Sequence, residues 1–344
     1  MKRWQKGILS FIAIVVVLLA AGISTTIGWR PFFGPKARPL TDRRFEPTPE
    51  RMQRGEYLVR NVAGCLFCHS DLDTSQEGLP VKAGYAGAGR PFTAEDMPWL
   101  IASNITSDAE TGAGAWTDDM LARAIREGIG HDGRALFPMM PYLNYRAMSD
   151  EDLASVITYI RSLPAVRRAH PATDIPFPPG PLINTIPEPL DGPVAAPDTS
   201  TIEKRGEYLT RMASCTECHT PRNEQGDFLP GMYMAGGNIL KYEGARPERA
   251  APNLTPAANG IPYYNEELFI GVIRTGRVRE RQISDVMPWG HYRGMTDDDL
   301  RAIFAYLKTV TPVDHYVDNA MEPTACARCG LVHGGGSRNR SAEN

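Results

Sequence analysis

The chain has 344 residues, of which 42% are hydrophobic and 22% charged, and its formal net charge is -3. This length suits two domains, and the nearly neutral charge provides no basic surface, so we expect no nucleic-acid partner. The 29 prolines and 32 glycines argue against one large regular sheet or bundle and favour small domains joined by irregular connections.

The first predicted element is a membrane-spanning helix at residues 7–28. This run of 22 residues carries no charge, and a transmembrane helix needs roughly 20 residues. A secretory signal has a shorter apolar region of about 7–15 residues and a small-x-small cleavage site, for which Ala20-Ala21-Gly22 is a poor match. We therefore expect an uncleaved anchor, followed by a juxtamembrane linker at residues 29–50. Basic residues flank the run on both sides, so charge does not orient it.

The motif Cys-x-x-Cys-His follows at residues 65–69 and recurs at residues 215–219. On one helical turn, two such thiols reach the two vinyl groups of a haem and form thioethers, while the adjacent histidine faces the iron. A disulfide, a redox pair or half of a zinc site would use the same cysteine spacing. The 40 residues after His69 contain neither cysteine nor histidine, which disfavours zinc, and the repetition favours haem. The predicted attachment residues are Cys65, Cys68 and His69 in the first motif, and Cys215, Cys218 and His219 in the second.

The two halves of the chain are similar well beyond the cysteines. "RGEYLVRNVAGCLFCHS" aligns with "RGEYLTRMASCTECHT", and "MPYLNYRAMSDEDLASVITYIRSL" aligns with "MPWGHYRGMTDDDLRAIFAYLKTV". Each half reads as a helix into the cysteine motif, a long loop, a second helix, a Met-Pro loop and a closing helix, which Ser149 or Thr296 caps. The predicted segments are domains at residues 51–165 and 201–312, a proline-rich linker at 166–200 and a tail at 313–344.

These motifs make each half similar to a class I cytochrome c domain. Over roughly residues 50–165 and 200–312, the halves together resemble the membrane-anchored di-haem cytochromes c of bacterial respiratory chains, including those that serve alcohol and aldehyde dehydrogenases. The resemblance implies an all-α fold of two tandem class I cytochrome c domains behind one transmembrane helix, with two covalently bound haems c. Because haem c is attached outside the bacterial inner membrane, it also implies a single-pass inner-membrane protein with both domains in the periplasm.

In this family the second axial ligand of the iron is a methionine of the Met-Pro loop. Met287 is the clear choice in the second half, 68 residues after the proximal histidine. Met140 lies 71 residues after the first proximal histidine, and the tyrosine and methionine downstream of it keep the same intervals. Met97 also precedes a Pro-Trp pair but lies only 28 residues after that histidine, and Met139 is one residue out of register. We therefore predict Met140 and Met287 as the iron ligands.

The family also hydrogen-bonds the proximal histidine to a proline carbonyl, which fixes the tautomer of the ring. Pro80 and Pro230 each lie eleven residues after their histidine, so we expect their carbonyls to accept from its Nδ1 atom. Asn104 and Asn253 occupy equivalent places in the repeat. We interpret them as candidate contacts for the haem propionates.

Met/His ligation closes both irons to substrate, so the expected function is single-electron transfer rather than catalysis. The donor would be a dehydrogenase or a quinol-oxidising complex, and the acceptor a protein such as a terminal oxidase. Two alternatives stay open: a peroxidase-like di-haem oxidoreductase, and an obligate cytochrome subunit of a dehydrogenase or haem-copper oxidase complex. His291, four residues after Met287, aligns with Asn144 and is interpreted as a loop residue rather than a competing ligand.

The tail contains a third Cys-x-x-Cys pair, Cys326 and Cys329, but Gly330 stands where a proximal histidine would be needed. We therefore expect no third haem. His333, together with the more distant His315, makes a zinc site an alternative. In an oxidising compartment, two cysteines this close favour a disulfide, which is the preferred prediction for the tail.

Overall fold

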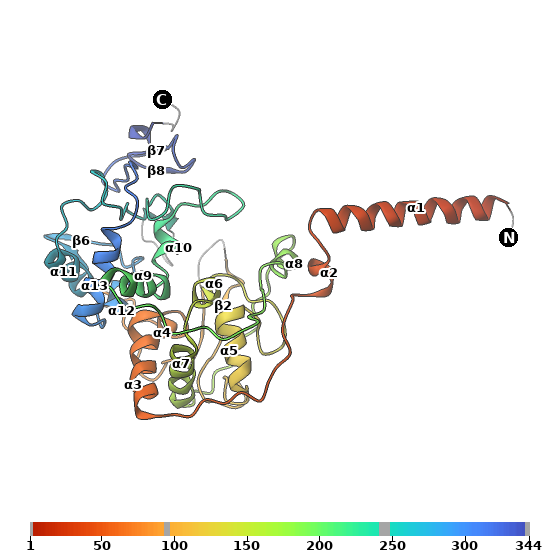
Figure 1. Cartoon of the computed structure of the whole chain (residues 1–344), viewed down its shortest axis with the longest axis horizontal. Coiled ribbons are helices and arrows are strands. Elements are labelled where there is room, and N and C mark those ends of the chain that lie inside the picture. Colours follow the sequence, from red (N-terminus) through yellow and green to blue (C-terminus); the bar gives the residue numbers. More distant parts are fainter. Residues whose placement is uncertain (1–2, 93–96, 241–247, 341–344) are drawn as a thin grey trace. The chain divides into compact units, whose positions relative to one another are not determined.

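A computed structural model describes residues 3–92, 97–240 and 248–340. Helices dominate these residues, and the strands among them form only short two-stranded antiparallel sheets (Figure 1). This architecture confirms the prediction of an all-α cytochrome c fold with an apolar N-terminal helix. The chain divides into two compact units: an anchor unit of Met1–Arg44, Trp116–Arg146 and Asp174–Gly192, and a repeat unit of Phe45–Ala115, Ala147–Thr173 and Pro193–Asn344. The domain limits inferred from the repeat stay a prediction.

The anchor unit begins with the apolar helix α1 (Arg3–Thr25), none of whose residues is buried. Its 23 residues are long enough and apolar enough to cross a membrane. It ends before the predicted limit, because Gly28 has a φ of +69° and its N–H bonds the Ile23 carbonyl at 2.8 Å, which closes the C-terminus of the helix. The other helices of this unit are α2 (Arg30–Phe33), α5 (Asp118–Glu127), α6 (Tyr142–Tyr145) and α8 (Pro179–Ile183).

A buried ion pair ties the segment that follows the anchor to α5. Arg38 donates to both carboxylate oxygens of Asp119, at 2.7 Å each, and to Glu127 at 2.9 Å. The side chain of Asp119 is fully buried. Burial alone would raise the pKa of Asp119, but hydrogen bonds from Arg38 and Thr41 hold it below its usual value. Asp119 is therefore charged at neutral pH and keeps this segment on the helix.

The repeat unit holds both cysteine motifs. Its helical elements are α3 (Pro49–Tyr57), the π-helical turn η1 (Leu58–Val62), α4 (Cys65–Cys68), α7 (Asp150–Ser162), α9 (Ile202–Met212), α10 (Cys215–His219), α11 (Glu266–Thr275), α12 (Trp289–Tyr292), α13 (Asp297–Leu307) and the 3-10 turn η2 (Gly336–Arg338). Its strands pair as β1 (Arg90–Pro91) with β2 (Ile101–Ala102), β3 (Ile239–Leu240) with β4 (Arg249–Ala250), β5 (Arg277–Val278) with β6 (Arg281–Gln282), and β7 (Pro323–Ala325) with β8 (Val332–Gly334).

In each half, the helix that leads into the cysteine motif packs against the closing helix, α3 on α7 and α9 on α13 (Figure 1). A glycine makes each close crossing. A Cβ added to Gly55 would lie 2.0 Å from the Ser155 carbonyl oxygen, and one added to Gly206 would lie 1.8 Å from that of Ala302. The glycine of the repeated "RGEYL" therefore lets two helix backbones touch.

The closing helices start and pack as the sequence predicts. Ser149 accepts a hydrogen bond from the Asp152 N–H at 3.1 Å, and Thr296 accepts one from the Asp299 N–H at 3.2 Å, so both caps are confirmed. Their apolar stripes form the buried core of the two halves. The buried residues of these stripes are Leu153, Val156, Ile157 and Ile160 on α7, and Leu300, Ile303, Phe304 and Leu307 on α13.

We expect Gly206→Ala to destabilise the protein by about 1–3 kcal/mol, because the added methyl group overpacks the α9–α13 crossing. The measurement is thermal unfolding of the detergent-solubilised chain, followed by circular dichroism. Gly271→Ala is the matched control: it lies inside α11 with nothing within 4 Å of an added Cβ, so it should be neutral or stabilise by up to about 1 kcal/mol. Equal stability of the two variants would contradict the close crossing.

Candidate functional site

Each cysteine motif forms one short helical turn, α4 in the first half and α10 in the second. Both turns follow a residue in the left-handed conformation, Gly64 with a φ of 68° and Ser214 with a φ of 54°. Among the described residues, no disulfide joins the four motif cysteines, and each is only partly buried. Two thiols one turn apart, with a histidine directly after them, match the geometry that covalent haem attachment requires.

The two motif histidines have the same hydrogen-bonding pattern. The Nδ1 atom of His69 lies 2.7 Å from the Ser103 carbonyl oxygen, and that of His219 lies 2.9 Å from the Pro252 carbonyl oxygen. A backbone carbonyl only accepts, so Nδ1 carries the proton and Nε2 keeps a lone pair. Burial lowers the pKa of both rings below the usual value. Each imidazole is therefore neutral and presents Nε2 in the form that binds iron, so these residues fit a haem.

The prediction that Pro80 and Pro230 supply these carbonyls is wrong. Both prolines lie at the exposed surface, and the Pro80 carbonyl accepts from the Asp73 N–H at 2.8 Å. After each motif the chain first makes a surface turn, closed by bridges such as Leu72 with Val81. It returns to the histidine only 34 residues later in the first half and 33 in the second.

A buried asparagine next to each acceptor holds it in place. The Asn104 amide donates to the Val166 carbonyl at 2.8 Å, and the Asn253 amide donates to the Val313 carbonyl at 2.9 Å. Each asparagine also accepts from the backbone and hydroxyl of the threonine two residues later. Through these bonds, each asparagine connects the carbonyl that accepts from the motif histidine to the segment that follows the closing helix. They contradict the interpretation of Asn104 and Asn253 as propionate contacts.

The Met-Pro loops of the two halves have the same backbone turn. The Met140 N–H donates to the carbonyl three residues earlier at 3.1 Å, and its own carbonyl accepts from the N–H two residues later at 2.8 Å. Met287 makes the same two bonds, at 3.1 and 2.7 Å. Met139 is 43% exposed. Met97 precedes strand β2 rather than a helical turn. Met140 and Met287 therefore lie in the same local backbone turn, and their role as iron ligands stays a prediction.

The aromatic residue two positions after each of these methionines packs against the C-terminal end of the helix that precedes the loop. Trp289 is 3% exposed, and a Cβ added to Gly276, at the end of α11, would lie 2.3 Å from it. In the anchor unit, Tyr142 is fully buried and sits 2.5 Å from a Cβ added to Gly128, at the end of α5. Gly128 and Gly276 have φ values of 71° and 67°. Only glycine combines this backbone conformation with so close an aromatic ring.

The second Met-Pro loop also packs on the first cysteine motif within the repeat unit. Asp285 accepts from the Trp289 indole and from the Gly78 N–H, both at 3.1 Å. A Cβ on Gly64 would lie 2.9 Å from Nε2 of His291. Burial lowers the pKa of His291 to about 4, so the ring is neutral. His291 thus lies in helix α12 rather than in a loop, against the first motif. That it does not compete as a ligand stays a prediction.

The two halves exchange equivalent hydrogen bonds. Asp152 on α7 accepts from Arg54 of its own half at 2.7 Å and from the Tyr208 hydroxyl of the other half at 2.6 Å. Asp299 on α13 pairs with Arg205 at 2.5 Å and accepts from the Tyr57 hydroxyl at 2.5 Å. Both tyrosines belong to the repeated "RGEYL". Each half therefore completes the start of the other half's closing helix.

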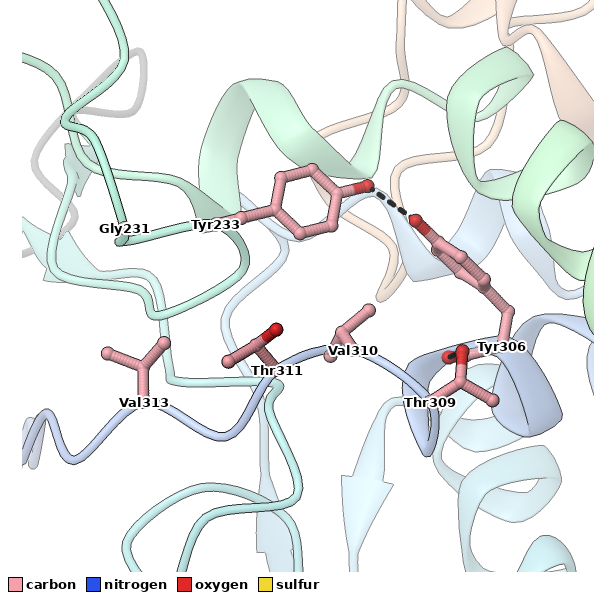
Figure 2. A pocket seen from close by; sticks show the side chains of 7 residues that line it. All are labelled: Gly231, Tyr233, Tyr306, Thr309, Val310, Thr311 and Val313. Carbon is pink, nitrogen blue, oxygen red and sulfur yellow. Dashed lines mark hydrogen bonds between the residues drawn. The ribbon is translucent and has the colours of Figure 1, made fainter.

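A shallow pocket lies beside α13, lined by Gly231, Tyr233, Tyr306, Thr309, Val310, Thr311 and Val313. Figure 2 shows Tyr233 and Tyr306 pointing toward one another, and their hydroxyl oxygens are 3.0 Å apart. The lining includes no motif cysteine or histidine and no methionine. This pocket is therefore not the candidate site.

Sequence reasoning missed Ser103, Pro252 and the exchanged tyrosines. Ser103 and Pro252 directly precede the paired Asn104 and Asn253, so the repeat alignment pointed to the right segment, although their carbonyls carry no side-chain signal. The hydrogen bonds from Tyr57 and Tyr208 depend on how the two halves pack together, which the sequence pattern of either half does not predict.

Fold and site together define a c-type cytochrome, and comparison with known proteins agrees. No protein-family profile matches the chain. It is 30% identical over 320 residues to a "Diheme cytochrome c-type" protein of Cereibacter sphaeroides, covering 90% of this chain and 100% of that protein. It is 30% identical over 319 residues to the fructose dehydrogenase cytochrome subunit of Gluconobacter japonicus, and 28% identical over 310 residues to the cytochrome c subunit of a quinone alcohol dehydrogenase of Gluconobacter oxydans.

The match to the Cereibacter protein extends over its whole length, so this chain belongs to the di-haem cytochrome c family. The two dehydrogenase subunits match 88% and 85% of this chain. The chain spans only 59% and 61% of their own lengths.

We expect Tyr57→Phe and Tyr208→Phe each to destabilise the protein by about 1–3 kcal/mol, because each removes a hydrogen bond to a buried carboxylate. Burial and the bond to Asp299 raise the pKa of Tyr57 to about 12, so this hydroxyl remains a donor at physiological pH. The measurement is the thermal midpoint of the haem-loaded chain. Tyr85→Phe, at a side chain 41% exposed, is the control. Midpoints unchanged in both variants would show that the exchange contributes nothing.

Proposed function

We propose that this chain is a membrane-anchored electron carrier that binds two haems c, one at each cysteine motif. The observation that supports it is the shared geometry of the motifs, in which each histidine holds Nδ1 on a carbonyl and leaves Nε2 for an iron. Cys65, Cys68, Cys215 and Cys218 would form the thioethers, and Met140 and Met287 the second axial bonds.

When bound, haem c supplies an iron that gains or loses one electron at a time. The protein's residues hold this centre still. A histidine held by a carbonyl would keep its ring orientation when it binds the iron, and a neutral thioether would favour the reduced iron. If His69, His219, Met140 and Met287 all bind iron, the chain would leave substrate no place on either iron, which favours a carrier over a peroxidase-like enzyme.

The proposed setting is the outer face of the bacterial inner membrane, with α1 as a single-pass anchor and both haem domains in the periplasm. The donor is a membrane-associated dehydrogenase or a quinol-oxidising complex, and the acceptor is a redox protein such as a terminal oxidase. A dehydrogenase is the favoured partner, because relatives at 28–30% identity are named as cytochrome subunits of dehydrogenases. Co-purification of a dehydrogenase after mild detergent extraction would make the chain an obligate subunit.

We expect two covalently bound haems per chain, both low-spin with His/Met ligands. The pyridine haemochrome absorbance per mole of protein measures the number. The weak near-infrared band of methionine bound to ferric haem reports the ligand. One haem per chain, or absence of this band in the oxidised protein, would contradict the proposal.

Met140→Ala and Met287→Ala should each convert one haem to a high-spin or histidine-captured form and lower its reduction potential. The reason is that axial ligands set haem potentials over a range of about 0.8 V. Spectroelectrochemical titration measures both potentials. Met139→Leu and Met97→Leu are the matched controls and should leave both potentials in place. A shift in Met139→Leu as large as that in Met140→Ala would show that the ligand register is wrong.

A further inference from the structure

Four side chains of the tail meet in one buried cluster that the two cysteine motifs do not use. They are His315, Cys326, Cys329 and His333, and their ligand atoms all lie within 4.8 Å of one another. Their exposed fractions are 0%, 3%, 6% and 1%. His315 follows α13, Cys326 and Cys329 lie in the turn between β7 and β8, and His333 is on β8.

Both histidines are oriented as metal ligands. Nδ1 of His315 bonds the Ala235 carbonyl at 2.8 Å, and its Nε2 lies 3.4 Å from the Cys326 sulfur. Nδ1 of His333 bonds the Gly334 carbonyl at 3.2 Å. Its Nε2 is buried and has no hydrogen-bond partner among the described residues. A carbonyl on one ring nitrogen and a free lone pair on the other is the usual arrangement of a metal-binding histidine.

The two cysteines form a tight turn that brings both sulfurs to the histidines. The Cys326 N–H bonds the Leu331 carbonyl at 2.8 Å, and the Gly330 N–H bonds the Cys326 carbonyl at 2.9 Å. The Cys329 N–H donates to the Cys326 sulfur at 3.4 Å, which holds this sulfur inside the turn. Gly330 has a φ of +75°. This conformation explains why glycine follows Cys329, where a haem motif has histidine.

We propose that His315, Cys326, Cys329 and His333 bind one structural zinc ion. Two thiolates and two imidazoles are a preferred donor set for tetrahedral zinc, whose bond lengths put neighbouring ligand atoms about 3.3–3.8 Å apart. The four ligand atoms, which lie within 4.8 Å of one another, would move closer together on binding to reach that spacing. On binding, the two thiols release their protons to solvent, and two thiolates balance the charge of the ion.

This replaces the disulfide predicted from the sequence. Both tail cysteines are free in the structure. A disulfide would remove the two sulfurs as ligands and leave the buried Nε2 atoms of His315 and His333 without a ligand between them. An unsatisfied buried polar group costs about 1–3 kcal/mol. Zinc satisfies all four groups at once.

The zinc site holds the loop beside the second motif histidine. Ala235, which accepts from His315, precedes Gly236, whose N–H bonds the His219 carbonyl at 2.7 Å. The carbonyl of His315 accepts from Asn253 at 3.0 Å. A Cβ on Gly237 would lie 2.7 Å from the His315 ring and 3.6 Å from the Cys329 sulfur. The cluster therefore packs directly on this loop.

The first half holds the corresponding loop through an ion pair and a histidine. Gly89 bonds the His69 carbonyl at 2.8 Å, as Gly236 bonds that of His219. Arg168 accepts from Asn104 through its carbonyl, as His315 does from Asn253, but its side chain pairs with Asp71 at 2.8 Å. His170 bonds the Ala88 carbonyl at 3.0 Å. An ion pair in one half thus takes the place of the zinc ion in the other.

The test is the metal content of the full chain, extracted in mild detergent and purified through a tag without histidines. We expect about one zinc per chain in addition to haem iron, with X-ray absorption at the zinc edge showing two sulfurs at about 2.3 Å and two nitrogens at about 2.0–2.1 Å. Haem absorbance does not interfere with this measurement, and it needs no variant. Cys329→Ser and His333→Gln should lose the zinc, whereas His170→Gln, the matched control in the first half, should keep it.

Removal of the zinc with a chelator should increase amide hydrogen exchange in the segment 229–238 and leave the corresponding segment 79–89 unchanged. Equal exchange in the second-half segment with and without zinc would refute the role in holding the loop. A chain without zinc, whose unreduced tail peptide is two hydrogens lighter than the dithiol, would overturn the site in favour of the disulfide. Full zinc retention in Cys329→Ser would show that the metal lies elsewhere.

Discussion

The hydrogen bond from each motif histidine to a backbone carbonyl is the interaction on which the rest of the repeat unit depends. A histidine binds iron through an unprotonated ring nitrogen, and a hydrogen bond from its other nitrogen fixes the tautomer and the orientation of the ring. The carbonyls of Ser103 and Pro252 meet this requirement. They lie more than thirty residues downstream of the histidines, so a long loop must be held in place before the site exists. The asparagine beside each acceptor, and the segment it ties down after the closing helix, provide that support.

The two halves support the carbonyl that accepts from the motif histidine with the same backbone arrangement but with different side chains. In both halves an asparagine bonds the segment that follows the closing helix. A histidine of that segment, His170 or His315, bonds an alanine carbonyl in the loop that contacts the motif histidine. The first half completes this with Arg168 and Asp71, and the second with four buried cysteine and histidine side chains. The Arg168–Asp71 pair is partly buried, with side chains 28% and 25% exposed. A metal ligated by the chain would hold its loop more firmly.

The sequence predicted the repeat, the cysteine turns, the caps at Ser149 and Thr296, and the helical order, because each is a local pattern. It misplaced the histidine's partner, since a carbonyl has no residue signature and the loop returns from a distance that spacing alone does not measure. The sequence favoured a disulfide over a zinc site in the tail for a related reason. Cys-x-x-Cys-x-x-x-His supplies three ligands in sequence, and the fourth, His315, reaches the cluster only through the path of the chain after α13. The domain limits rest on the repeat alone.

The reciprocal contact between the halves has a consequence for how such a chain could arise. Each half contributes the same tyrosine and the same aspartate, so the contact is one that two identical copies of a single domain would make about a twofold axis. A duplicated gene joined head to tail would inherit this interface ready-made, with the linker raising the effective concentration of each half for the other. Once joined, the copies no longer need to stay identical. One copy could then acquire a metal site while the other kept an ion pair, and the interface between the halves would stay intact.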